Sequence, residues 1–205
     1  MKSIKIPQDY NPTVGEVKKY IKRWNGPEHK VGKNKELALK KLFVELCPEN
    51  KDFNDILIKC STLNDFYSTN IFDVHSVALR IMKLNIDERL KQGDYTLVED
   101  IAKVEVGKTG KPKSERYFYS FATKYCSHHQ PEKYAIYDSY VEKLLWDFQK
   151  RDDFSEFNLS DLKKYPKFMR VIHDFQRHYG LEKFTVKELD QYLWQLGKQI
   201  FSNYE

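Results

Sequence analysis

The chain has 205 residues, with 35 Lys or Arg against 30 Asp or Glu, so its formal charge is +5. That length suits one compact domain with a substantial core, divided into two lobes around a cleft. No apolar stretch approaches the roughly 18 residues needed to cross a bilayer, and the N-terminus lacks the apolar segment of a secretory signal. The three scattered cysteines exclude a disulfide framework and a CxxC metal site. We therefore expect a soluble cytoplasmic protein that needs no cofactor, with no metal site and no obligate protein partner.

The positive charges gather in two regions of the sequence, from Lys18 to Lys41 and from Lys103 to Arg116. Two basic regions on a nearly balanced protein are typical of a surface that faces a polyanion, and ordinary solubilising lysines are the alternative. The aromatic content is high, with 14 Tyr, 13 Phe and 3 Trp. Most of these rings must pack the core, because helices this polar need large residues to bury enough area.

Helical signals dominate the first half of the chain. A capping box at Thr13–Glu16 opens a helix that we expect to close near Asn25-Gly26, where glycine can adopt a left-handed turn. The next helix carries four apolar residues at helical spacing on one face, Leu39, Leu42, Phe43 and Leu46. Further helices are predicted over about 52–67, 74–81 and 96–104.

The second half is also predicted to be helical. A glycine and lysine turn at 106–113 separates the helix ending near Val104 from one starting near Ser114. Helices are then expected at about 114–128, 139–151 and 167–179, and a second capping box at Thr185–Glu188 opens the last one. No convincing run of period-two residues indicates a strand. The sequence therefore predicts an all-α fold.

The turn at 106–113 is the first candidate binding feature. Such a turn exposes backbone N–H groups, and a following helix adds its positive N-terminal end, so the two together can hold a phosphate. It is not a Walker loop, because the GxxxxGK[ST] spacing is absent and no strand is predicted before it. A solvated connection between two helices is the alternative interpretation.

The second feature is Asp138, which follows a short extended segment and precedes a predicted helix. An Asp in this position is ordinarily an N-cap. The helix dipole also favours its ionised form, and an ionised carboxylate can stabilise positive charge on a sugar or activate a water molecule. One residue can serve both purposes.

Two segments around these features resemble a known superfamily. Tyr117-Phe118-Tyr119-Ser120-Phe121-Ala122-Thr123-Lys124-Tyr125-Cys126 and Ile136-Tyr137-Asp138-Ser139-Tyr140-Val141 are similar to helix–hairpin–helix DNA glycosylases, most of all to small bacterial proteins with the oxoguanine-glycosylase fold. Leu63–Ile71 and Asp190–Lys198 also resemble that bacterial group, so the resemblance extends from about 63 to 198. It implies two helical lobes around a DNA-binding cleft, one with the hairpin over roughly 52–130 and one from roughly 1–51 plus 131–205.

The resemblance also implies roles for individual residues. Asp138 takes the place of the catalytic carboxylate, and a lysine near the hairpin forms a Schiff base in the bifunctional members. The hairpin pattern departs from the usual one, since Gly107 and Gly110 are three apart rather than two. The candidate lysines are Lys111, Lys113 and Lys124, and a monofunctional enzyme that uses only Asp138 and water is an equal alternative. The four-cysteine iron–sulfur cluster of some relatives is impossible with three cysteines.

The resulting hypothesis is an N-glycosylase that bends double-stranded DNA, extrudes one nucleotide and excises its base. Contacts to the DNA backbone are expected from the turn and its flank, at Gly107, Lys108, Gly110, Lys111, Lys113 and Arg116. The base pocket is expected to involve Tyr137, Tyr140, His128 and His129, although packing tyrosines and ordinary surface histidines are the alternative. The resemblance allows oxidised purines as the target, or hypermodified phage bases if the protein acts in anti-phage defence.

Two other functions fit the same residues. The chain could be a DNA-binding module of this fold without chemistry, with Asp138 only an N-cap. It could also be an unrelated helical interaction or toxin-type protein whose basic regions meet RNA or an acidic partner. The response of Asp138→Asn and the salt dependence of DNA binding separate these alternatives from the enzyme.

Overall fold

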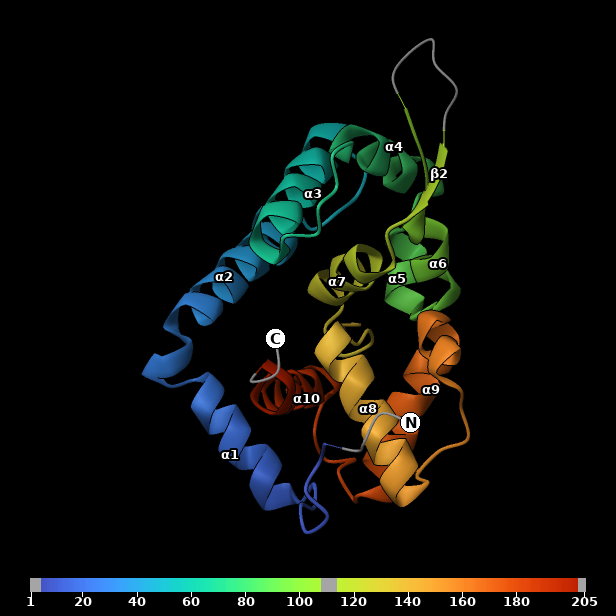
Figure 1. Ribbon diagram of the computed structural model, residues 1–205. Helices are drawn as coiled ribbons and strands as arrows, with labels where there is room; N and C mark the ends of the chain where they lie inside the picture. Colours follow the sequence, from blue (N-terminus) through green and yellow to red (C-terminus); the bar gives the residue numbers. More distant parts are fainter. Residues whose placement is uncertain (1–4, 108–113, 203–205) are drawn as a thin grey trace. The chain divides into compact units, whose positions relative to one another are not determined.

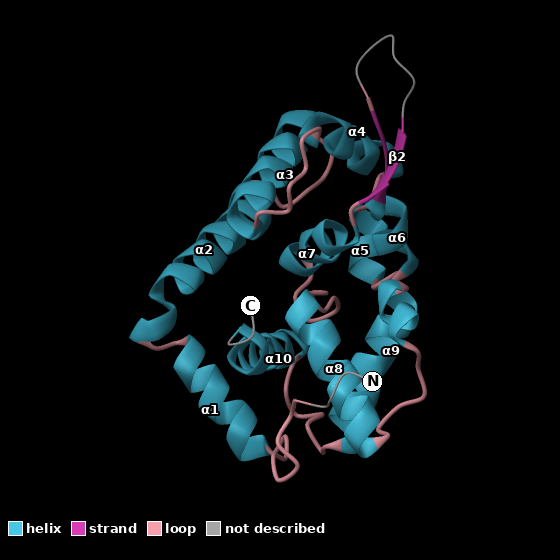
Figure 2. Cartoon of the chain, viewed as in Figure 1, coloured by secondary structure: helices cyan, strands magenta, loops and turns pink. Residues whose placement is uncertain are grey.

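The computed structural model describes residues 5–107 and 114–202, which belong to two compact units (Figure 1). Unit 1 combines residues 5–30 with 137–202, and unit 2 spans residues 31–136. Residues 31–51, which the sequence analysis placed with the second lobe, therefore lie in unit 2 with the hairpin. The described chain is mostly helical, as expected, with one short pair of strands (Figure 2).

Unit 1 is built from helices at both ends of the chain. They are α1 (Val14–Trp24), the 3₁₀ turn η1 (Pro27–His29), α8 (Ser139–Asp152), the 3₁₀ turn η3 (Leu159–Lys163), α9 (Tyr165–His178) and α10 (Val186–Phe201). Helix α10 packs against both α1 and α8, so the last helix joins the first to the middle of the sequence. The core is rich in rings, as the composition predicted, and its fully buried members include Phe148, Phe168, Phe175 and Tyr192.

The helix starts of unit 1 follow the predicted capping chemistry. The Thr13 hydroxyl accepts a hydrogen bond from the Glu16 N–H at 3.2 Å, and Thr185 with Glu188 forms a complete capping box. The expected left-handed turn at Gly26 is wrong, because this residue has φ −83° and caps η1 in extended conformation. Gly180 does adopt positive φ, at +64°, shortly after α9 ends.

Unit 2 contains the middle of the chain. Its elements are α2 (Lys30–Lys40), the π-helix η2 (Lys41–Leu46), α3 (Phe53–Tyr67), α4 (Val74–Leu84), α5 (Asp87–Gln92), α6 (Thr96–Ala102), β1 (Lys103–Val106), β2 (Ser114–Tyr117) and α7 (Tyr119–His129). Helix α7 packs against η2, α3 and α6, and nearly all of its residues are buried. It is therefore the central element of this unit.

The π-helix corrects the predicted apolar face of the second helix. Leu39 and Phe43 are buried as expected, whereas Leu46 is 63% exposed. A π-helix has more residues per turn than an α-helix, so a spacing that aligns apolar residues in an α-helix no longer aligns them here. Cys47, the residue after η2, is buried in place of Leu46.

The segment around the glycine and lysine turn is a further correction. The helix before it ends at Ala102, and Lys103–Val106 pairs antiparallel with Ser114–Tyr117. The next helix, α7, begins only at Tyr119, so no helix N-terminus directly follows the turn and the predicted phosphate-binding combination is wrong. Strand β1 alternates in burial, but four residues are too few for periodicity to distinguish a strand from a helix end.

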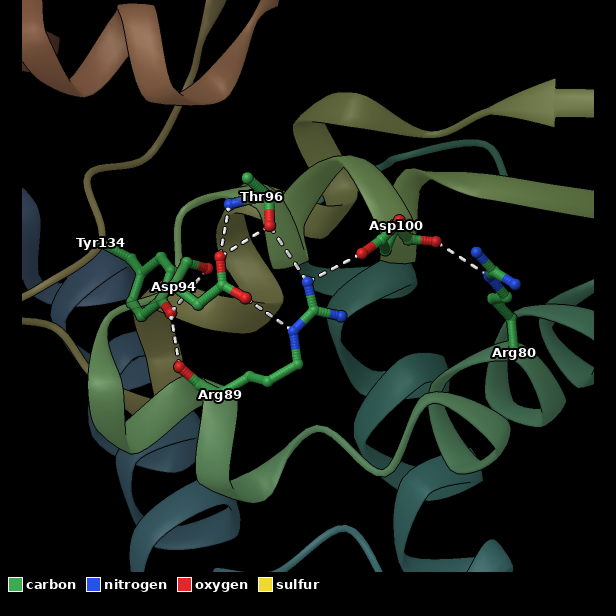
Figure 3. Close-up of polar contacts among 6 residues, drawn as sticks. All are labelled: Arg80, Arg89, Asp94, Thr96, Asp100 and Tyr134. Carbon is green, nitrogen blue, oxygen red and sulfur yellow. Dashed lines mark hydrogen bonds and ion pairs between the residues drawn. The ribbon is translucent and has the colours of Figure 1, made fainter.

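A polar network centred on Arg89 joins α5 and α6, and Arg80 of α4 reaches it by donating to the Asp100 carbonyl oxygen at 2.8 Å (Figure 3). The Arg89 guanidinium donates to Asp94 at 2.7 Å, to Asp100 at 2.8 Å and to Thr96 at 3.1 Å. The Tyr134 hydroxyl donates to the backbone oxygens of Arg89 and Asp94 at 3.3 and 3.2 Å. The network therefore fixes the segment after α7 against the start of α6. Across residues 5–107 and 114–202, no helix combines the length and apolar character required to cross a membrane.

Candidate functional site

Asp138 is the N-cap of α8 in unit 1, as the sequence predicted. Its backbone is extended, with φ −140° and ψ 152°, and its Oδ1 accepts a hydrogen bond from the Tyr140 N–H at 2.8 Å. The side chain is only partly buried. A carboxylate offers several lone pairs, so this single bond leaves capacity for another partner. The arrangement places a partly exposed acid at the amino end of a 14-residue helix, where negative charge is favoured.

The two tyrosines beside Asp138 have packing contacts within unit 1. The Tyr137 hydroxyl donates to Glu142, and its ring lies edge-on to Phe168 with centroids 5.7 Å apart. Burial raises the pKa of Glu142 above its ordinary value. The Tyr140 ring lies under the Lys143 ammonium, 5.7 Å from its centroid. Tyr137 therefore contacts α8 and α9, and Tyr140 contacts its own helix α8, which are contacts of the packing kind that the sequence analysis set against a pocket role.

Gly197 of α10 explains how closely the start of α8 is packed. A Cβ atom at this position would lie 2.8 Å from the Tyr140 carbonyl oxygen and 3.0 Å from its carbonyl carbon. Real Cβ atoms do not approach backbone that closely, so only glycine fits here. The resemblance had singled out residues 190–198 without giving this reason.

Lys124 lies in unit 2, on a polar stripe of α7. Its side chain is 5% exposed, and its Nζ donates to Ser120 Oγ at 2.5 Å and to the Ser120 carbonyl oxygen at 3.3 Å. The ammonium also lies 5.2 Å from the centroid of the Tyr67 ring. His128 follows one turn later, and its Nε2 is 2.9 Å from the Tyr67 hydroxyl oxygen. Because positions i and i+4 share a helix face, this stripe brings Ser120, Lys124 and His128 together with Tyr67.

The two adjacent histidines lie in different surroundings, and neither is an ordinary surface histidine. His128 is 7% exposed and belongs to the Lys124 stripe. His129 lies beside the Phe43 and Tyr125 rings, with centroid distances of 4.9 and 5.3 Å. Burial, with help from the Lys59 charge, holds the pKa of His129 well below its ordinary value, so it is neutral near pH 7.

A buried lysine that the sequence analysis did not identify lies next to His129. Lys59 Nζ donates to the carbonyl oxygens of Cys47 and Glu49 at 3.0 and 2.9 Å and to Asn50 Oδ1 at 2.7 Å. Its Nζ is 3.3 Å from His129 Nε2. Burial lowers the pKa of Lys59 to about 8. This group, which we call the Lys59 cluster, caps the carbonyl groups that follow η2 and anchors the end of α7.

The predicted DNA contacts around the turn fall into two groups. Lys108, Gly110, Lys111 and Lys113 lie outside the described residues. Gly107 follows β1, and its N–H donates to Asp73 Oδ2 at 3.4 Å. Arg116 is exposed on β2, opposite Val104. The arms of this hairpin therefore carry an exposed arginine, and the Asp73 carboxylate holds one end of β1.

The described residues contain no group of three or more His, Cys, Asp or Glu side chains that could hold a metal ion. Cys47, Cys60 and Cys126 are all buried thiols. Burial raises the pKa of both Cys60 and Cys126 above the ordinary value, so these thiols stay protonated near neutral pH.

Comparison with known proteins finds a protein family whose model matches most of unit 2 and part of α1. The HI_0787_N family, described as an N-terminal domain, matches residues 16–133, so the chain belongs to this family. The match includes Lys124 and His128 and ends before Asp138. An uncharacterized protein of Haemophilus influenzae is 55% identical over 139 residues, which are 67% of this chain and 64% of that protein. The chain thus matches less than two thirds of its relative's length. No solved structure matches it.

Proposed function

We propose that this member of the HI_0787_N family is a DNA N-glycosylase with Asp138 as its catalytic carboxylate. The observation that carries the proposal is the partly exposed Asp138 side chain at the amino end of α8. The resemblance of residues 117–126 and 136–141 to helix–hairpin–helix glycosylases adds to it. The proposed fold is two helical lobes around a DNA-binding cleft.

The proposed reaction replaces a base with a hydroxyl group at C1′ of an extruded deoxyribose. The C1′–N bond breaks, its electron pair leaves with the base, and positive charge develops on the sugar. The Asp138 carboxylate stabilises this charge and accepts a proton from the water whose oxygen bonds to C1′. The leaving base takes up a proton and Asp138 releases the one that it accepted, so the carboxylate is restored and the products are a free base and an abasic site.

Among the residues that the structure describes, we propose Lys124 as the amine for the alternative mechanism, in which a lysine forms a Schiff base with the sugar. In that route its neutral amine attacks C1′, and the bond from C1′ to the base breaks, with its electron pair and one amine proton leaving on the base. The C1′–O4′ ring bond then opens, the second amine proton passes to O4′, and an imine to the opened sugar remains. Its hydrogen bonds to Ser120 hold the amine in one rotamer on α7. Borohydride trapping distinguishes the routes: an adduct that disappears in Lys124→Gln but not in Lys111→Gln or Lys113→Gln identifies the nucleophile, and no adduct supports water.

Exposed basic residues support a double-stranded DNA partner. Strand residues Lys103 and Arg116 are exposed, as are several lysines of α1 and α2, including Lys18, Lys22 and Lys40. Cations that neutralise phosphates release counterions, so affinity is expected to fall steeply with salt. A duplex-binding titration between about 50 and 200 mM salt tests this, and a flat response contradicts the proposed phosphate contacts.

The decisive experiment uses duplexes and genomic DNAs that carry oxidised purines or hypermodified phage bases, followed by alkali to reveal abasic sites. Asp138→Asn is the key variant, because asparagine keeps the N-cap hydrogen bond while removing the charge. We expect about a 10²–10⁴-fold loss of excision rate, with little change in stability. Asp52→Asn is the matched control, since Asp52 caps α3 in the same way. Full excision activity in Asp138→Asn contradicts the catalytic role of Asp138. The absence of abasic sites on every substrate contradicts the enzyme, and together with retained duplex binding it favours a non-catalytic DNA-binding module.

A further inference from the structure

Unit 1 contains a cavity between α1, η1 and α10 that the proposed chemistry does not use. Its volume is about 310 Å³, within the range of small-molecule sites. Asp138 is not among the residues that line it. The lining residues are Arg23, Glu28, His29, Trp194, Gln195, Lys198, Gln199 and Ser202.

Two aromatic residues, His29 and Trp194, line the cavity, and Trp24 packs against both without being a lining residue. The His29 ring stacks on Trp24, with centroids 5.2 Å apart and an interplanar angle of 29°. Trp194 meets Trp24 edge-on at 5.9 Å and His29 at 6.4 Å. Flat rings held in this way by one another are suited to stacking with a planar heterocycle.

A buried hydrogen-bond acceptor without a partner in the residues that the structure describes belongs to Gln195, one of the residues that line this cavity. Gln195 is 4% exposed, and its Nε2 donates to the carbonyl oxygens of Tyr20 and Gln191, both at 3.0 Å. Two carbonyl acceptors fix the orientation of the amide, because a flipped amide would place oxygen against oxygen. Gln195 Oε1 then has no hydrogen-bond partner among the described residues. A buried acceptor without a donor is destabilising, so an occupant with an N–H donor would satisfy it.

His29 adds a second buried polar atom that lacks a hydrogen-bond partner among the described residues. Its Nε2 is buried and has no hydrogen-bond partner in the described part of the chain. Burial and the nearby Arg23 charge lower the pKa of His29, so the ring is neutral near pH 7. A neutral imidazole presents one donor and one acceptor, and can therefore pair with either edge of a heterocycle.

The rim of the cavity is cationic. Arg23 forms an ion pair with Glu28 at 2.8 Å and donates to Gln199 Oε1 at 3.2 Å. Lys198 Nζ lies 4.9 Å from the centroid of the Trp194 ring, above one wall. Two cations and one acid leave a net positive charge at the opening, which favours an anionic substituent.

We propose that this cavity binds a nucleotide. Its base stacks on the ring walls and donates an N–H to Gln195 Oε1, while Lys198 and Arg23 hold its phosphate. The ligand is either a free mononucleotide or a nucleotide of a single strand, because both present the same base and phosphate. The inference uses only unit 1 contacts and does not depend on excision chemistry.

Tryptophan fluorescence tests the proposal, because all three tryptophans belong to unit 1. Trp146 packs on Phe157 and does not line the cavity, so the full chain carrying Trp146→Phe leaves Trp24 and Trp194 as reporters. The probes are the four deoxynucleoside monophosphates, the matching nucleosides, inorganic phosphate and a single-stranded oligonucleotide. We expect saturable quenching by the monophosphates or by the oligonucleotide, and the more effective of the two identifies the source.

Variants in this background identify the contacts. His29→Ala and Lys198→Met should each weaken binding by about 3–10-fold, the range for one hydrogen bond or one exposed charge contact. Lys18→Met is the matched control, since it removes an exposed charge of α1 outside the cavity and should leave affinity unchanged. Neither of the first two changes removes a core residue, so folding is expected to persist, as circular dichroism can verify. Quenching by none of the probes, or equal affinity in all three variants, overturns the proposal, as does quenching by inorganic phosphate alone.

Discussion

Gly197→Ala tests whether the start of α8 depends on close backbone contact with α10. The new Cβ would lie 2.8 Å from the Tyr140 carbonyl oxygen, and both atoms belong to regular helices that cannot move independently. Overpacking of this kind costs about 1–3 kcal/mol, whereas alanine gains up to about 1 kcal/mol in helix propensity. We therefore expect a net loss of about 1–2 kcal/mol in the unfolding free energy of unit 1.

Gly15→Ala is the control for this change. Its Cβ would meet only Thr13 Oγ1, at 3.6 Å, which is ordinary van der Waals contact. The same substitution should then be neutral or stabilise unit 1 by about 0.5 kcal/mol through helix propensity. Urea unfolding followed by tryptophan fluorescence reports on unit 1 specifically, since every tryptophan lies there. Equal stability changes in the two variants would refute the close-contact reasoning.

Three further results are expected. Lys59→Met removes the donor to the Cys47 and Glu49 carbonyl oxygens, while Asn50 Oδ1 keeps its hydrogen bond from the Tyr125 hydroxyl. It should lower stability by about 2–3 kcal/mol in urea unfolding followed by circular dichroism, whereas the exposed Lys51→Met should change it by less than about 1 kcal/mol. Although burial opposes ionisation of Asp94, hydrogen bonds from Thr96 and Arg89 hold its pKa below the ordinary value. The stability advantage of the wild type over Asp94→Asn should thus be complete above about pH 4 and shrink as the pH falls further, and a difference that grows in acid would contradict it. Protein carrying Arg89→Met should show a weaker acid dependence than the wild type, measured in the same pH series.

The sequence predicted most helix starts because capping is a local interaction. Thr13, Asp138 and Thr185 all cap the helices expected of them, through hydrogen bonds that span two or three residues. The hairpin was missed because its strands pair across the intervening turn, and neither strand is long enough for a period-two pattern to stand out. Leu46 was misplaced because a π-helix leaves no recognisable signal in residue spacing.

The site was predictable only where its residues are close in sequence. Asp138 could be identified from its position before a helix. Lys59 could not be identified, because the carbonyl groups that its ammonium binds belong to a separate segment of the chain. A lysine in a helix is ordinarily expected to face solvent. The Ser120, Lys124 and His128 stripe had an available signal, since the three are spaced four apart. The aromatic cavity joins residues near both ends of the chain, which no local pattern connects.

The burial of α7 has a consequence for how this protein can evolve. From Tyr119 to His128 nearly every side chain is enclosed, including those of Thr123, Lys124 and Ser127. Most helices have a water-facing side on which substitutions accumulate freely, and this one has almost none. Amino-acid substitutions between related sequences should therefore be rare along the whole length of α7 rather than on one face. They should accumulate more slowly here than in the exposed helix α2.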